Sequence, residues 1–174
     1  CDTKPIFEFL EFLSSSLYPF QNKINENPLI EKLSRLRLNF MEKLIEDQHY
    51  QEGYTIGRGL IKYMTNSEEW KLHLNLLLKM KLINIAYEYL GTCFCVYYFS
   101  LTNTSIETII GSPQYLKIKK LYHLFFEDLI INEKIEILLS FPFNFIEKYL
   151  FKEFLLENKK YEDLLSTHNM ENGQ

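Results

Sequence analysis

The sequence has 174 residues, of which 47% are hydrophobic and 24% are charged. This length fits one compact domain or two interlocked helical halves, and the composition is that of a globular protein, which excludes extensive intrinsic disorder. Nineteen basic and 23 acidic residues give a formal net charge of −4. Neither sign is concentrated along the chain, so nothing here indicates a surface for nucleic acids or anionic membranes.

Prolines mark the starts of the first two predicted helices. Pro5 follows Thr3 and Lys4 and opens a stretch whose apolar residues recur at helical spacing until Pro19. Pro28 opens a second stretch, in which apolar residues repeat every three or four positions opposite a charged face. These apolar residues are Leu29, Leu33, Leu36, Phe40 and Leu44. The pattern predicts an amphipathic helix.

Residues 48–64 combine helical spacing with three glycines. Each glycine destabilises a helix interior by about 1 kcal/mol relative to alanine, so their presence needs a reason. We expect Gly53 and Gly57, which lie four residues apart on one side, to let a neighbouring helix approach closely. A phosphate-binding loop is the alternative. It fits poorly, because Gly57-Arg58-Gly59 lacks the third glycine of a dinucleotide fingerprint and the Lys-Ser/Thr of a P-loop.

The middle of the chain predicts two antiparallel helices. Ser67 is the expected N-cap of the first, with Glu68 and Glu69 in its first turn. Read as one helix, residues 76–90 would be apolar nearly all round, so we expect a tight turn at residues 79–81. Residues 92–99 are rich in strand-forming side chains, but no other segment offers a partner strand, and we therefore expect a buried helix there.

The C-terminal half continues the helical pattern. A capping-box sequence at Thr104 predicts a short helix ending at Gly111, and further helices are expected from Ser112 to Asn132, at 133–140, at 145–157 and around Tyr161. We thus predict one all-α domain over residues 1–168 and a disordered tail over 169–174. About eight or nine stacked antiparallel helices would form an α-solenoid-like array or an irregular bundle. The order helix, short turn, helix is similar to that of tetratricopeptide-like units, although no second copy lies in register.

The three cysteines, Cys1, Cys93 and Cys95, are too few for a structural zinc site and are odd in number. We expect reduced thiols and an intracellular protein, cytoplasmic or nuclear. Because the first residue is Cys rather than Met, we also expect the domain to be excised from a larger protein. The alternative is a secreted helical bundle in which Cys1 is bridged to Cys93 or Cys95.

No pattern in the sequence points to catalysis. The four histidines are 24, 50 and 45 residues apart, and neighbouring carboxylates point about 100° apart on a helix. These histidines are His49, His73, His123 and His168. The longest charge-free apolar stretch, Leu90 to Leu101, is too short to span a bilayer. We therefore expect no catalytic residue, no cofactor, no metal, no nucleic-acid partner and no membrane span.

Aromatic side chains at predicted helix starts are the remaining candidates for recognition. Trp70 is the only tryptophan, and three phenylalanines surround Pro142 in the segment Phe141–Phe145. Phe143 and Phe145 are two residues apart at a helix start, so they cannot both point into one core, and we expect one of them to be exposed. The functional hypothesis is a non-enzymatic helical scaffold that binds another protein through Trp70, Phe143 or Phe145. A secreted signalling bundle and an all-helical enzyme without a visible site remain alternatives.

Overall fold

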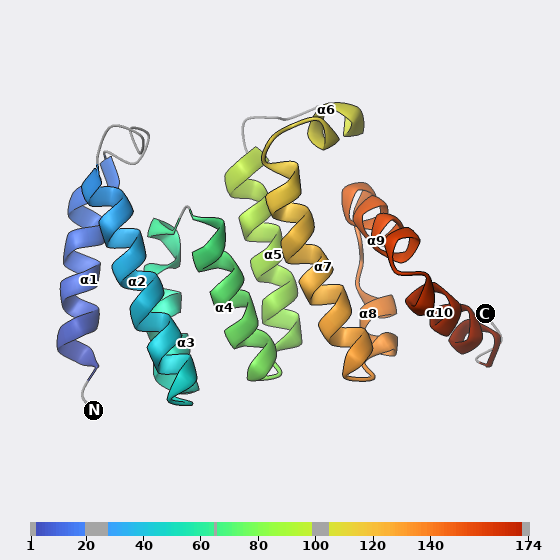
Figure 1. The fold of residues 1–174 in the computed structure, drawn as a ribbon, viewed down its shortest axis with the longest axis horizontal. Helices are drawn as coiled ribbons and strands as arrows, with labels where there is room; N and C mark the ends of the chain where they lie inside the picture. The colour runs from blue at the N-terminus through green and yellow to red at the C-terminus, as the bar shows by residue number, and fades with distance from the viewer. Residues whose placement is uncertain (1–2, 20–27, 65, 99–104, 172–174) are drawn as a thin grey trace. The chain divides into compact units, whose positions relative to one another are not determined.

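The computed structural model describes residues 3–19, 28–64, 66–98 and 105–171 (Figure 1). These ranges contain ten α-helices and one short 3-10 helix, and no strand. The predicted all-α class is confirmed, with slightly more helices than the eight or nine expected. The chain divides into two compact units, Cys1–Tyr87 and Glu88–Gln174, and the division falls inside helix α5.

Unit 1 is built around helix α2, which packs against α1, α3 and α4 (Figure 1). The helices of this unit are α1 (Lys4–Leu17), α2 (Pro28–Glu46), α3 (Tyr50–Leu60), the 3-10 helix η2 (Ile61–Tyr63), α4 (Ser67–Lys79) and the first part of α5 (Ile83–Tyr98). Leucines at helical spacing fill the interior, among them Leu33, Leu44, Leu60, Leu74 and Leu77. The long apolar stretch therefore folds as predicted, as two helices separated by a tight turn.

Unit 2 has an aromatic interior. Its further helices are α6 (Ile106–Ile110), α7 (Tyr115–Ile131), α8 (Ile135–Ser140), α9 (Phe145–Glu157) and α10 (Lys159–Glu171). Helix α7 packs against α8 and α9, and α9 packs against α10. The ring of Phe126 lies between Phe151 and Phe154, with centroid distances of 5.0 and 5.6 Å, which are ordinary separations for packed aromatic rings.

Three interhelix turns share one geometry although the sequence shows no repeat in register. Gln48, Lys81 and Glu133 follow α2, α4 and α7, and each has a φ of 59° to 62°. Each residue donates its backbone N–H to the carbonyl three residues earlier, and the next residue donates to the carbonyl five residues before itself. This pattern is the Schellman motif, in which the residue with positive φ is usually glycine. The same turn geometry thus recurs after three helices, with a different residue at the positive-φ position each time.

Helix starts differ from the predicted caps at two places. Asn66, not Ser67, caps α4, because its side chain accepts a hydrogen bond from the backbone N–H of Glu68. Ser105 caps α6 by accepting from the N–H of Thr108, and the predicted cap Thr104 lies outside the described residues. In both cases the cap is displaced by one residue from its predicted position, within the usual uncertainty of sequence patterns.

The ends of α5 and α10 test the predicted helix over residues 92–99 and the predicted tail over residues 169–174. Helix α5 continues to Tyr98, so the segment rich in strand formers is helical up to that residue. Helix α10 continues to Glu171, into the predicted tail, and residues 172–174 lie outside the described ranges. No helix within the described ranges is long and apolar enough to cross a membrane.

Candidate functional site

The segment between α8 and α9 is held rigidly at the start of α9. Asn144 has an extended backbone, its side chain accepts a hydrogen bond from the N–H of Glu147 at 2.8 Å, and the Glu147 carboxylate accepts from the Asn144 N–H at 3.1 Å. This reciprocal pair is a capping box, which satisfies two backbone N–H groups at the helix start. Pro142 restricts the backbone just before it. The predicted helix start at residue 145 is confirmed.

The two phenylalanines beside Asn144 have different environments. Phe143 is half-buried and packs its ring against Phe126, Phe141 and Phe151. Phe145 is 62% exposed. Ile146, Leu150 and Phe154 form the buried stripe of α9, as their spacing predicts. The prediction that one of the two phenylalanines is exposed is therefore confirmed, and Phe145 is that residue.

Trp70 occupies a different position from the one expected. Its side chain is only 2% exposed, and the indole Nε1–H donates to the backbone carbonyl of Met64 at 2.8 Å. A buried indole with a satisfied N–H is a core residue of unit 1 and is not an exposed anchor for a partner. Trp70 is a candidate from the sequence because it is the only tryptophan and stands near a predicted helix start.

Gly53 and Gly57 lie where neighbouring helices approach α3. A Cβ placed on Gly53 would lie 3.3 Å from Leu76 Cδ2, and one placed on Gly57 would lie 2.5 Å from His73 Nδ1. Both contacts come from α4, so the predicted role in helix contact fits the structure. Gly59 plays a similar part toward α1, because a Cβ there would lie 2.7 Å from Phe7 Cζ. Sequence reasoning named no role for Gly59.

A buried ionic network crosses unit 1. Arg37 on α2 donates from Nε to Glu69 Oε1 at 2.7 Å and from Nη2 to Glu69 Oε2 at 3.2 Å. Ser34 donates to the same carboxylate, and Ser14 of α1 accepts from Arg37 Nη1 at 2.9 Å. Both charged side chains are 3% exposed. The Glu69 carboxylate is thus paired in the interior of unit 1, although it stands in the first turn of α4.

A polar ladder joins α7 to α9 in unit 2. Lys119 donates to Glu157 at 2.6 Å and to Glu153 at 3.4 Å, and the Tyr115 hydroxyl donates to Glu153. The hydrogen bond to Glu157 raises the pKa of Lys119, and the same contact lowers the pKa of Glu157. Burial lowers the pKa of His123, whose Nδ1 lies 3.8 Å from Glu157. These groups are arranged in pairs that hold two helices together.

The outward face of α9 was missed from the sequence. Lys148 and Lys152 are exposed, and Leu156 is 54% exposed. They fall on the same side as Phe145, at spacings of three and four residues. The signal lies in the spacing, because these residues fall on the side of α9 opposite its buried stripe.

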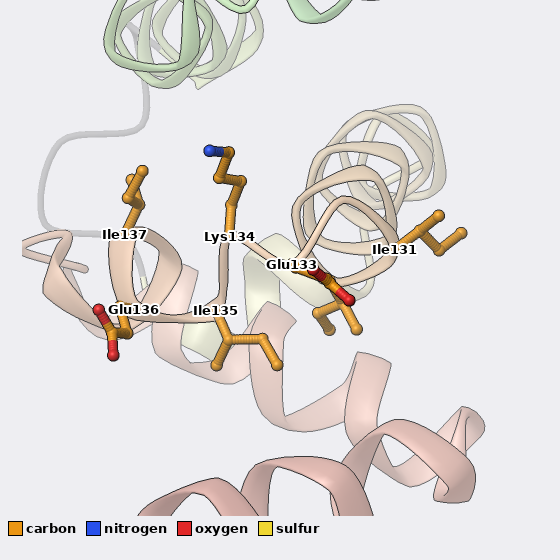
Figure 2. Close-up of a pocket in the computed structure, with 7 residues that line it drawn as sticks. Ile131, Glu133, Lys134, Ile135, Glu136 and Ile137 are labelled. Carbon is orange, nitrogen blue, oxygen red and sulfur yellow. The ribbon is translucent and has the colours of Figure 1, made fainter. Parts of the chain in front are cut away.

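A shallow pocket of about 540 Å³ lies where α7 turns into α8. Isoleucines form most of its lining, together with Glu133, Lys134 and Glu136. Figure 2 shows that Lys134 extends to one side of this turn, whereas the carboxylate of Glu136 lies on the other. The polar groups thus diverge, and they do not converge on one centre as catalytic groups do.

No family model, curated protein or solved structure matches this chain. Among the described residues, no group of three His, Cys, Asp or Glu side chains is placed so that it could hold a metal ion. At the start of α9 an exposed aromatic side chain, Phe145, stands directly on a capped helix start.

Proposed function

We propose that this chain is a non-enzymatic helical module that binds another protein at the start of α9, with Phe145 as the main anchor. The observation that carries the proposal is the 62% exposure of Phe145 on a backbone fixed by the capping box of Asn144 and Glu147. Large aromatic side chains contribute strongly to protein interfaces because they bury much apolar area. A pre-ordered anchor also loses little conformational entropy on binding.

The polar contacts of unit 2 support a structural rather than a chemical role for its charged groups. Lys119 is held between Glu153 and Glu157, and Glu147 accepts hydrogen bonds from the Asn144 backbone and from the Tyr122 hydroxyl at 3.0 Å. Each of these groups ties one helix to another or caps a helix. An intracellular location accompanies the proposal, supported by the free thiols of Cys93 and Cys95.

The test compares capture of partners by the wild-type chain, Phe145→Ala and Leu116→Ala. Leu116 is 61% exposed on α7 of the same unit, so its truncation removes a similar exposed apolar group away from the proposed anchor. Proteins captured from extracts of the native cells are identified by mass spectrometry, and the affinity of each purified candidate is then measured for all three chains.

The expected result is a partner whose affinity falls by about 2 kcal/mol or more with Phe145→Ala and hardly changes with Leu116→Ala. Both variants should unfold within about 0.5 kcal/mol of the wild type, as is usual for exposed sites. Partners that bind all three chains equally well would reject the start of α9 as the binding surface.

A further inference from the structure

The outward face of α9 combines apolar and basic side chains, and this combination specifies the partner's chemistry. Resting on the proposed function, we infer that the segment docking on this face is an acidic one, with Asp or Glu side chains interspersed among apolar residues. We define the α9 outer face by its members, which are Phe145, Lys148, Tyr149, Lys152 and Leu156.

Helical geometry places these residues on one side of α9. Lys148, Lys152 and Leu156 succeed one another at intervals of four residues, and Phe145 precedes Tyr149 by the same interval. Residues three or four positions apart lie on one side of a helix, so the two series run next to each other. Tyr149 is half-buried, whereas the others are exposed. The face is thus a continuous surface along the length of α9.

Each of the three carboxylates of α9 is already paired with a group outside this face. Glu147 is 6% exposed and accepts from the Tyr122 hydroxyl. Glu153 accepts from Tyr115 and Lys119, and Glu157 pairs with Lys119. Neither Lys148 nor Lys152 has an ion pair among the described residues.

The segregation leaves two uncompensated positive charges beside apolar groups on a chain whose formal net charge is −4. Complementary charge favours a partner that offers carboxylates to the two lysines and apolar side chains to Phe145 and Leu156. An anionic membrane is less suited to this face, because stable electrostatic anchoring takes clusters of about four to eight basic residues. The observations therefore favour an acidic, apolar protein segment.

The experiment selects peptides from a random library on the folded full chain. The affinity of the selected peptides is then measured by fluorescence anisotropy for the wild type, Phe145→Ala, Lys148→Glu/Lys152→Glu and Lys117→Glu/Lys120→Glu. The last variant is the matched control, since Lys117 and Lys120 are exposed on α7 of the same unit and the change in charge is identical. Circular dichroism and thermal unfolding verify that each variant is folded, and Lys148→Gln/Lys152→Gln replaces the charge reversal if that variant unfolds.

We expect the selected peptides to be enriched in Asp and Glu next to apolar residues. Their affinity should fall about tenfold or more with Lys148→Glu/Lys152→Glu and less than about twofold with the control. Peptides in which the acidic residues are changed to Lys should prefer the charge-reversed chain over the wild type. Raising the salt concentration should weaken the wild-type complex.

Three outcomes would overturn the inference. Peptides that lose affinity with Phe145→Ala but not with Lys148→Glu/Lys152→Glu would reject the acidic partner and leave the proposed interaction module intact. Peptides whose affinity changes with neither variant would reject both the acidic partner and the binding surface at α9. Binding of the wild type to vesicles of equal parts phosphatidylserine and phosphatidylcholine, lost in the charge-reversed variant, would assign the face to a membrane instead.

Discussion

Arg37 of α2 and Glu69 of α4 form a two-point ion pair inside unit 1, with Nε–Oε1 and Nη2–Oε2 distances of 2.7 and 3.2 Å. Two serines add to the pair, because Ser34 donates to the carboxylate and Ser14 accepts from the guanidinium. A buried pair of this kind does not add much net stability, since removing both ions from water opposes their attraction. It does fix which faces of α1, α2 and α4 meet.

Breaking this pair on one side should destabilise the protein strongly. Glu69→Leu leaves the Arg37 guanidinium buried without its counter-ion, and we expect the free energy of unfolding to fall by about 3 to 5 kcal/mol. Urea unfolding followed by circular dichroism measures the change. The double variant Arg37→Met/Glu69→Leu, which removes both charges, should recover most of that loss. A double variant no more stable than Glu69→Leu would show that the pair itself stabilises the fold.

Replacing Gly57 tests the close approach of α3 and α4. The added Cβ would meet the imidazole of His73 at 2.5 Å and Met41 Cε at 3.2 Å, so Gly57→Ala should destabilise by about 1 to 3 kcal/mol through overpacking. From helix propensity alone the same change would be mild or stabilising. The structure corrects that expectation, because the space beside Gly57 is already filled.

Gly91→Ala provides the matched control for Gly57→Ala. Gly91 lies within α5, and a Cβ there would meet nothing within 4 Å, so its replacement should stabilise by up to about 1 kcal/mol through helix propensity. Equal effects of the two substitutions on thermal unfolding would contradict close packing at Gly57. In the variant Gly57→Ala/His73→Ala the Cβ atom has room, and the two changes should be less destabilising together than their sum.

The sequence predicted the positions of the helices better than the contacts between them. Prolines and apolar spacing locate α1, α2 and α9, because these signals act within a few residues. The exposure of one of the two phenylalanines, Phe143 or Phe145, followed from their separation of two residues at a helix start. Both inferences are local, and both agree with the structure.

Features that depend on distant residues were not predictable. Glu69 pairs with Arg37, which is 32 residues away, and no local pattern distinguishes a paired carboxylate from a solvated one. The buried position of Trp70 was not predictable either, because its burial depends on the helices of unit 1 that pack around it. The repeated turns were hidden for another reason. The three turns share one backbone conformation, but the residues at its positive-φ position, Gln48, Lys81 and Glu133, have no side-chain chemistry in common.

The two neighbouring cysteines should react differently with alkylating reagents. Burial raises the pKa of the Cys93 thiol to about 12, whereas Cys95 is exposed. Since the thiolate is the reactive form, iodoacetamide at neutral pH should modify Cys95 in the folded protein and spare Cys93. In Cys95→Ser, mass spectrometry of the peptide containing residue 93 should find no label until urea is added. Labelling of Cys93 in the folded variant would contradict its burial.

The buried histidine of unit 1 should make the protein sensitive to acid. Burial lowers the pKa of His73 to about 4, from about 6.5 in the unfolded chain. The unfolded state therefore binds a proton more readily, and stability should fall as the pH decreases from about 6.5 to about 4. The shift corresponds to a loss of up to about 3 kcal/mol from this one group. Above pH 7 both states are neutral at His73, and the contribution vanishes.

Urea unfolding of wild type, His73→Leu and His49→Leu at pH 7.5 and pH 4.5 isolates this contribution. All other titrating groups are the same in wild type and His73→Leu. The difference between the two chains in how the free energy of unfolding changes with pH therefore reports His73 alone. Any effect of the substitution on packing is already present at pH 7.5 and does not enter this difference. His49 is exposed, and the variant at that position should keep the full loss of stability in acid. If His73→Leu loses as much stability as the wild type between the two pH values, the imidazole is not held neutral in the interior, and the acid sensitivity comes from the carboxylates.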